Sequence, residues 1–349
     1  MIKYVRGNLL EASTEAIVNT VNTVGIMGKG IALQFKKAFP DNFAYYEAAC
    51  KRNEIKVGKV HVFRRLQQPR YIINFPTKQH WKAKSRIEDI ATGLESLAGV
   101  IREYGIKSIA MPPLGCGLGG LPWPKVRAMI EQTFANMPDV SIFAYEPAGA
   151  PRPEDMPIRT NKPKMTISQA IIITLMDRYA SPLFNEFVSL LEIQKLTYFQ
   201  QVCGEKLSLH FNKGNYGPYA DNLRHVLNRM DGHYISGWGD GQNKPRTPLH
   251  LLAGAVEEAN RLIGQNIETN SRLTRISNLI DGFETPYGME LLGTVHWVIT
   301  QELRPPIKFD DVVQAIKSWT KRKENLFTPD HIEVALRRLV DSCLISPVD

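Results

Sequence analysis

The chain has 349 residues, 43% of them hydrophobic and 22% charged, which is typical of a soluble globular protein with room for two domains. No run of roughly 18 apolar residues is present, so we expect no transmembrane helix and no membrane partner. The first residues already have the pattern of a strand, and the pattern of a signal peptide is not seen. Four scattered cysteines without a Cys-x-x-Cys pair argue against a zinc site or a disulfide framework and favour a reducing cytoplasm.

The net charge of +8 is concentrated in the first part of the chain. Residues 1–155 carry 21 Lys and Arg against 14 Asp and Glu, whereas residues 156–349 carry 22 against 21. A basic excess of this kind favours a polyanionic partner such as nucleic acid, which would meet the N-terminal part first. Ordinary surface charge that keeps the protein soluble is the alternative explanation.

The N-terminal part alternates between strand and helix patterns. Apolar residues alternate in the β-rich runs, and Ile87, Ile90 and Leu94 recur at helical spacing. In chain order we predict strands 2–5 and 16–21, helices 30–39 and 42–52, strands 59–63 and 70–75, helix 86–104, strand 108–111, helix 124–137 and strand 141–145. The predicted fold class is α/β over residues 1–150, with a mostly parallel mixed sheet and helices on both faces.

The second half is predicted to be a mainly α-helical domain over residues 164–349. A proline-rich linker, residues 151–163, separates the two domains, because prolines among small and charged residues favour an extended chain. The predicted helices are 168–179, 184–201, 220–230, 249–263, 272–283, 287–300, 309–318 and 330–343, with one short strand at 207–211. The last three helices suggest a winged-helix-like tail over 287–349.

Two glycine-rich loops each follow a predicted strand and precede a predicted helix. The first contains Gly25, Gly28 and Gly30, and the second runs from Gly115 to Gly120. Glycine permits a positive φ and close approach of a ligand, and backbone N–H groups at the start of a helix attract phosphate. The first loop has neither the Gly-Lys-Ser/Thr ending of a P-loop nor the glycine spacing of a dinucleotide-binding fingerprint. Two such loops at the carboxyl ends of parallel strands favour one extended phosphorylated ligand.

The loops and the segment between them carry a family resemblance. The motifs are Asn22…Gly28-Lys-Gly30-Ile-Ala, Asn74-Phe-Pro-Thr-Lys78-x-His80-Trp81 and Leu114-Gly-Cys-Gly-Leu-Gly-Gly-Leu-Pro-Trp123. Together they resemble a macrodomain, the module that binds ADP-ribose, and more narrowly the macrodomain of the DarG antitoxins. The resemblance covers residues 1–150 closely and the whole chain by its layout.

This resemblance implies a function for each domain. The macrodomain is expected to hydrolyse the N-glycosidic bond between ADP-ribose and a DNA base, thymidine in single-stranded DNA. The C-terminal domain is expected to bind and inhibit a DarT-like DNA ADP-ribosyltransferase toxin. ADP-ribose is then ligand and product, and no metal or redox cofactor is implied.

The same resemblance assigns an ADP-ribose site. Asn22 is expected at the distal ribose, Asn8 near adenine, and the glycines at the diphosphate; Asn8 stands where many macrodomains have an acid. Cys116 is expected to pack as a small apolar residue. The predicted ADP-ribose-binding residues are Asn8, Leu9, Asn22, Gly28, Gly30, Ile31, Leu114, Gly115, Cys116, Gly117, Leu118 and Gly119.

Lys78 is the predicted catalytic residue. It follows a buried strand, and a lysine that is partly desolvated beside a glycine loop can lose its proton and act as a nucleophile. A charged lysine could instead stabilise charge on the departing base or on the ribose ring. A related human macrodomain enzyme pairs its lysine with an aspartate in the second glycine loop. Gly119 stands at that position here, so Lys78 is left as the leading residue.

Contacts with the two macromolecular partners are predicted from residue type and position. Trp81 is suited to stacking on a base and the nearby cations to binding phosphates, although a tryptophan that packs under its own loop is the alternative. Tyr and Arg are enriched at the centres of protein interfaces. The predicted DNA contacts are His80, Trp81, Lys82 and Lys84, and the predicted toxin contacts are Tyr198, Tyr216, Tyr219 and Arg224.

Two alternative functions remain open from the sequence. The macrodomain could bind ADP-ribose without cleaving it, which the absence of an acid at Gly119 favours, so that toxin binding would be the only antitoxic activity. It could also remove ADP-ribose from protein, although the basic first domain and Trp81 favour DNA.

Overall fold

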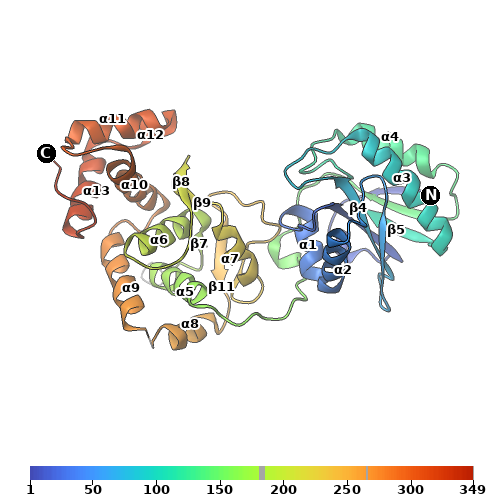
Figure 1. Cartoon of the computed structure of the whole chain (residues 1–349), viewed down its shortest axis with the longest axis horizontal. Helices are drawn as coiled ribbons and strands as arrows, with labels where there is room; N and C mark the ends of the chain where they lie inside the picture. Colours follow the sequence, from blue (N-terminus) through green and yellow to red (C-terminus); the bar gives the residue numbers. More distant parts are fainter. Residues whose placement is uncertain (181–184, 265, 349) are drawn as a thin grey trace. The chain divides into compact units, whose positions relative to one another are not determined.

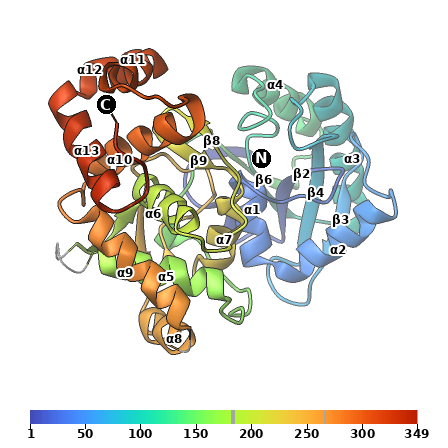
Figure 2. The same cartoon turned by 60° about the vertical axis from the view of Figure 1, so that its left-hand side comes forward.

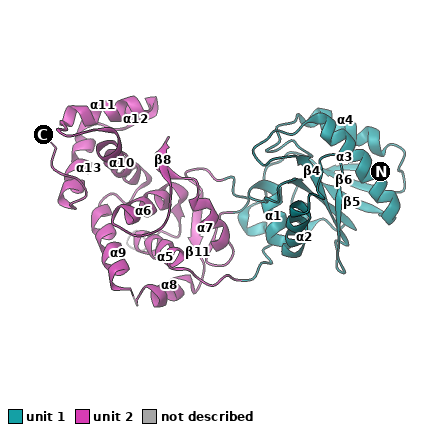
Figure 3. Ribbon diagram, viewed as in Figure 1, with its two compact units in different colours: residues 1–161, 239–242 teal, residues 162–238, 243–349 magenta. Residues whose placement is uncertain are grey.

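The computed structural model describes residues 1–180, 185–264 and 266–348. Internal contacts divide the chain into two compact units (Figure 3). Unit 1 comprises Met1–Asn161 and the short segment Gly239–Gln242, and unit 2 comprises Lys162–Trp238 and Asn243–Asp349. The boundary between them falls near the end of the segment 151–163, so most of the predicted linker belongs to unit 1.

Unit 1 is built on a six-stranded mixed sheet (Figure 1). The strands lie in the order β1-β6-β5-β2-β4-β3, and every neighbouring pair is parallel except β3 with β4. Their bounds are β1 Ile2–Val5, β2 Ala16–Asn22, β3 His61–Arg64, β4 Tyr71–Lys78, β5 Ser108–Met111 and β6 Ser141–Tyr145. The predicted fold class is therefore confirmed for this unit.

Helices cover both faces of this sheet because successive strand residues point to opposite sides. Ile17 packs in a cluster with Phe35 of α1, whereas its neighbour Val18 packs with the apolar residues of α3 and α4. The helices are α1 Gly30–Ala38, α2 Pro40–Lys51, α3 Ile87–Tyr104 and α4 Trp123–Phe134, with short 3-10 turns at Leu9–Glu11 and Pro153–Asp155.

Local signals account for the helix ends in unit 1. Pro40 begins α2 at a position where the missing N–H is not needed. Gly105, with φ of +64°, ends α3 in the left-handed conformation that favours glycine. The helices and strands predicted for this unit agree with the observed bounds to within a few residues.

Unit 2 is mainly helical, with two small sheets in the order β10-β11-β7 and β8-β9. Its centre is α6, whose residues are almost all buried, and α10 to α13 gather beyond it (Figure 2). The elements are α5 Ile167–Ala180, β7 Val188–Ser189, α6 Leu190–Val202, β8 Phe211–Gly214, β9 Gly217–Ala220, α7 Leu223–Met230, β10 Ile235–Ser236, β11 Pro248–Leu251, α8 Ala255–Ile263, α9 Ile267–Ile280, α10 Pro286–Trp297, a π-helical turn Val298–Glu302, α11 Phe309–Trp319, α12 Lys321–Leu326 and α13 Pro329–Asp341.

Several predictions for unit 2 are wrong where short strands replace helical turns. The predicted strand 207–211 is shifted to β8, which pairs with β9, and the helix predicted from Ala220 begins only at Leu223 because Ala220 belongs to β9. The helix predicted from Leu249 begins only at Ala255, since β11 pairs with β7 and β10. The pairing of β11 with β7 joins segments about 60 residues apart in sequence, which helical spacing alone does not reveal.

Two further predictions for unit 2 need correction. The helix predicted from Phe184 begins at Leu190, where Ser189 and Glu192 form a capping box; Phe184 itself lies outside the described residues. Over residues 286–348 the structure contains helices and no strand, so the predicted winged-helix-like tail lacks a β-wing there. In the described part of the chain no helix is both long and apolar enough to cross a bilayer.

Candidate functional site

The two glycine loops lie at one edge of the sheet of unit 1. Strand β2 is parallel to both β4 and β5, so the carboxyl ends of the three strands meet there. The register pairs Asn22 with Lys78, and Thr23 donates from its N–H and hydroxyl to the Gln79 carbonyl at 3.1 and 2.9 Å. The fold therefore brings Lys78 beside the first glycine loop, as predicted from its position after a strand.

Asn22 holds the first loop in shape. Its side-chain oxygen accepts hydrogen bonds from the N–H groups of Val24 and Ile26 at 3.0 and 3.3 Å, and its amide donates to the Ile26 carbonyl at 2.5 Å. Tyr46 donates to the Asn22 carbonyl at 2.7 Å, and the Asn22 side chain is only 4% exposed. The side chain predicted to contact ribose is thus occupied within its own loop in this structure.

Gly30 begins α1 with a φ of +64°. Its N–H, one of the predicted diphosphate donors, donates to the carbonyl of Asp240 at 2.8 Å within unit 1. Gly28 has room around it, since the nearest atom to an added Cβ would be the Ile26 side chain at 3.6 Å. A phosphate that used the Gly30 N–H would therefore replace this carbonyl.

The second loop leaves no space for a side chain at Gly119. A Cβ there would lie 2.3 Å from both the Gly115 carbonyl oxygen and the Ser85 hydroxyl. An aspartate at this position would overlap both groups, so this packing of the loop does not accommodate an acid at residue 119. Leu114 is buried beneath the loop, whereas Leu118 is 49% exposed on it.

Gly117 and Cys116 differ in their surroundings. Gly117 has no atom within 4 Å of an added Cβ, so the loop is open at this residue. The Cys116 thiol donates to the Leu114 carbonyl at 3.5 Å, and burial raises its pKa to about 11. A thiol of this kind stays protonated at neutral pH and is a poor nucleophile.

Lys78 is half-buried at the end of β4. Burial lowers the pKa of its ammonium group, and repulsion from Lys84 lowers it further. In the described part of the chain no ion pair holds the Lys78 ammonium. Both effects favour a neutral amine, which is the form that attacks as a nucleophile.

The segment after β4 forms an exposed basic loop. Trp81 is 36% exposed; the ring centroid of His80 lies 5.3 Å from the Trp81 ring, and the ammonium of Lys82 lies 4.9 Å from its centroid. Lys84 extends back toward the second glycine loop, with its ammonium 3.3 Å from the position of a Cβ on Gly120. Of the predicted DNA contacts, Trp81 is partly exposed, and Lys84 lies close to the second glycine loop.

Asn8 and Leu9 lie where β1 ends. The Asn8 amide donates to the Asp155 carbonyl at 2.7 Å, and its oxygen accepts from the Leu10 N–H at 3.1 Å. Leu9 is 4% exposed and packs in the same apolar cluster as Ile31 and Phe35 of α1. Through these contacts both residues stabilise the fold beside the predicted ADP-ribose site.

The predicted toxin contacts divide into surface and core. Tyr216 and Tyr219 are 36% and 43% exposed on the β8–β9 hairpin, and Arg224 forms an ion pair with Asp221 at 3.2 Å. Tyr198 is only 5% exposed, and its hydroxyl lies 2.7 Å from Nδ1 of His296. Tyr198 is therefore a core residue of unit 2, and its prediction as a surface contact is wrong.

Ser85 and Tyr46 shape the site but were not predicted from the sequence. Ser85 packs under Gly119, and its buried hydroxyl has no hydrogen-bond partner in the structure. Tyr46 reaches the first loop from α2, and burial raises the pKa of its phenol far above the ordinary value. Neither residue belongs to a glycine motif, so only the packing of separate elements reveals them. Among the described residues no three His, Cys, Asp or Glu side chains gather into a metal site.

This arrangement of sheet, helices and paired glycine loops defines a macrodomain protein. The Macro domain family model matches residues 18–130. A protein of Thermus aquaticus named DNA ADP-ribosyl glycohydrolase is 43% identical over 99% of this chain and 95% of its own length. The chain therefore belongs to the DNA ADP-ribosyl glycohydrolase family, and the resemblance seen in its motifs is confirmed.

Two further similarities concern parts of the chain. A Thermosipho africanus protein named DNA ADP-ribosyl transferase-DNA ADP-ribosyl glycohydrolase fusion protein is 37% identical over 42% of each chain. The solved macrodomain of Thermus aquaticus DarG is 54% identical, with a TM-score of 0.41; the match covers 42% of this chain and 99% of that structure.

Proposed function

We propose that unit 1 removes ADP-ribose from DNA by hydrolysing its N-glycosidic bond to a base, thymidine in single-stranded DNA. The observation that carries this proposal is the position of Lys78, half-buried at a strand end and beside the first glycine loop. The relatives named DNA ADP-ribosyl glycohydrolase over nearly the whole chain support DNA as the substrate, as does the basic excess of residues 1–155.

The proposed reaction adds one water across the bond. The base nitrogen recovers a proton, and the anomeric carbon of ADP-ribose takes the oxygen. The glycine loops bind the diphosphate through backbone N–H groups, and Trp81 stacks on a base of the strand. Lys78 either attacks the anomeric carbon as a neutral amine, forming a Schiff-base intermediate that water releases, or remains charged and stabilises the departing base.

A gel assay with ADP-ribosylated single-stranded DNA tests this activity. The wild-type protein is expected to remove the modification, and Lys78→Ala is expected to lower the rate by at least about 100-fold while ADP-ribose affinity changes little. Lys107→Ala is the control and should retain cleavage, because Lys107 is an exposed lysine just before β5, at the end of the sheet opposite the glycine loops. Full activity of Lys78→Ala would contradict the catalytic assignment.

A reader that binds ADP-ribose without cleaving it is the second candidate. The observation in its favour is that Ser85 and Gly115 leave no room for a carboxylate at Gly119. Wild-type protein that binds ADP-ribose but cleaves neither modified DNA nor modified protein would establish this function. Cleavage of modified protein alone would instead make unit 1 a protein-directed hydrolase.

For unit 2 we propose binding of a DarT-like DNA ADP-ribosyltransferase, which makes the whole chain an antitoxin. The fusion of transferase and glycohydrolase in the Thermosipho relative supports such a pairing. Tyr216 and Tyr219 on the β8–β9 hairpin are the exposed aromatic residues for this contact. Pull-down of the toxin by the full chain should be weakened by Tyr219→Ala, and unchanged retention would remove the hairpin from the interface.

A further inference from the structure

A cavity of about 150 Å³ lies in unit 1 away from the glycine loops. Its walls are the end of α1 and the start of α2, residues 38–42, together with Phe63, Arg65 and Arg159. Arg65 follows β3, and its N–H donates to the Arg70 carbonyl at 2.7 Å, just before β4 begins. Lys78 lies at the opposite end of β4, and an eight-residue strand spans roughly 23 Å. The cavity is therefore separate from the ADP-ribose site.

Two guanidinium groups flank this cavity and share one aromatic ring. Arg65 lies 4.8 Å and Arg159 5.5 Å from the centroid of Phe39. The Arg65 side chain is held by its donation to the carbonyls of Gln68 and Pro69 at 3.2 and 3.1 Å. The backbone of Arg159 is held by its N–H, which donates to the Lys37 carbonyl at 2.9 Å. Within the described residues neither guanidinium forms an ion pair with a carboxylate.

The field in the cavity is positive. Burial lowers the pKa of Arg65, and the nearby charge of Arg159 lowers it further, whereas Asp41 acts in the opposite direction. The side chains of Arg65, Arg159 and Asp41 together carry a net charge of one positive unit. The 12-residue helix α2 adds the positive end of its dipole, and its N-cap, Phe39, has no side-chain hydrogen bond that caps this end.

We propose that this cavity is a second anion site, in which Arg65 and Arg159 bind one phosphate group at the start of α2. The planar guanidinium fork matches the oxygens of a phosphate, and stacking on Phe39 orients both forks before the anion arrives. The phosphate comes either from the backbone of a DNA strand or from a small free phosphate compound. The first source rests on the proposed function of unit 1.

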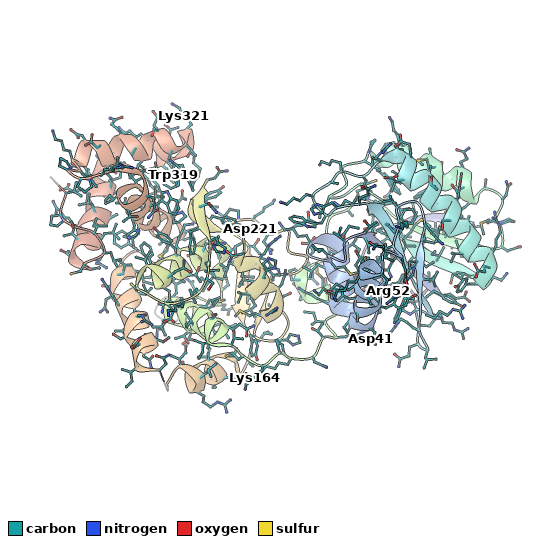
Figure 4. All side chains as sticks on the ribbon, viewed as in Figure 1. Asp41, Arg52, Lys164, Asp221, Trp319 and Lys321 are labelled. Atoms are coloured by element: carbon teal, nitrogen blue, oxygen red, sulfur yellow. The ribbon has the colours of Figure 1, made fainter. Side chains whose placement is uncertain are left out.

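Calorimetric titration of the full chain with inorganic phosphate tests the site, with the glycine loops first saturated by ADP-ribose. We expect Arg65→Gln and Arg159→Gln each to weaken phosphate binding about tenfold, since each removes a charged hydrogen-bond donor. Asp41→Asn should tighten binding, because it removes a negative charge from the cavity. Arg52→Gln is the matched control and should change nothing, because Arg52, labelled with Asp41 in Figure 4, follows the other end of α2. Its guanidinium already pairs with Glu54.

Two results of this titration would overturn the site. One is the absence of phosphate binding to the wild type. The other is equal affinity of Arg65→Gln, Arg159→Gln and Arg52→Gln. Misfolding of a variant could lower phosphate affinity but would not raise it. The increase in affinity expected for Asp41→Asn therefore tests the site independently of misfolding.

The source of the phosphate is decided with ADP-ribosylated strands of about 4 and about 16 nucleotides, the range of single-strand site sizes. If the site binds a phosphate of the DNA backbone, Arg159→Gln should raise KM for the longer strand about tenfold and leave kcat unchanged. The kinetic constants for the shorter strand should not change. For a free phosphate compound, the variant weakens binding of inorganic phosphate and thymidine 5′-monophosphate while both strands behave as in the wild type. Absence of cleavage by the wild type would refute the proposed hydrolysis but not the phosphate site.

Discussion

Gly119 lies against a backbone carbonyl and a serine side chain. The Gly115 carbonyl and the Ser85 hydroxyl each lie 2.3 Å from the position of its missing Cβ, and the Ser85 N–H donates to the Gly119 carbonyl at 3.1 Å. A side chain at this residue would push the second glycine loop away from the segment that follows Lys78. The residue that separates this chain from the lysine–aspartate pattern is thus determined by packing.

Gly119→Ala is expected to destabilise unit 1 by about 1–3 kcal/mol, the usual cost of overpacking, and to weaken ADP-ribose binding. Gly117→Ala is the matched control, because nothing lies within 4 Å of its added Cβ. Urea denaturation gives the free energy of unfolding, and calorimetry gives the affinity. Equal stability of the two variants would show that the loop adjusts freely around Gly119.

Lys84 is expected to control the protonation of Lys78. Its charge lowers the pKa of Lys78, so Lys84→Gln should raise that pKa and move the corresponding inflection of the pH–rate profile to higher pH. A rate that rises with pH through this inflection identifies the neutral amine as the active form, whereas a falling rate identifies the charged form. Lys82→Gln, which does not act on the pKa of Lys78, is the control.

At the scale of elements, α10 and α12 of unit 2 are joined by a buried charge cluster. Glu290 is 1% exposed and accepts from Arg322 at 2.6 and 2.9 Å and from Lys323 at 2.6 Å. Lys323 also donates to the Thr294 hydroxyl at 3.0 Å. Lys195 lies nearby, and its pKa is lowered to about 7 by burial and by the charge of Lys323. Glu290 is therefore the anion on which these buried cations depend.

Glu290→Gln is expected to lower the free energy of unfolding of unit 2 by about 3–5 kcal/mol, because it leaves Lys323 buried without its counter-charge. Glu333→Gln, which breaks the exposed ion pair with Arg337, should cost at most about 1 kcal/mol. Chemical denaturation of both variants measures the difference. Similar losses would indicate that the cluster is screened by water.

Each of the two units has its own hydrophobic core. The apolar clusters around the sheet of unit 1 contain residues of that unit alone, and one cluster runs through unit 2 from α5 to α13. Separate cores of this kind allow each unit to unfold as its own cooperative transition.

Calorimetric unfolding of the full chain should therefore show two transitions, and ADP-ribose should raise the temperature of only one. Ligand at 100 times its Kd stabilises the unit that binds it by about 2.7 kcal/mol. Glu290→Gln serves as the marker, because it should lower only the other transition. A single transition whose temperature is raised by ADP-ribose and lowered by Glu290→Gln would contradict independent unfolding of the two units.

Most strands and helices of unit 1 could be predicted from short stretches of sequence. Alternating apolar residues, helical spacing and terminators such as Pro40 and Gly105 act over a few neighbours, so the strands, the helices and both glycine loops could be located from the sequence. The parallel sheet followed from the alternation of strand and helix, and the position of Lys78 at a strand end followed from that sheet.

The α/β class of unit 1, its two glycine loops and the lysine between them could be predicted from the order of the residues, because each depends on a short run of the chain. Contacts between separate helices, strands and loops became known only from the folded structure. It places Ser85 under Gly119, buries Tyr198 and makes a strand of Pro248–Leu251, and it brings Arg65 and Arg159 to one ring. These outcomes depend on packing between segments far apart in the chain, which no local pattern encodes.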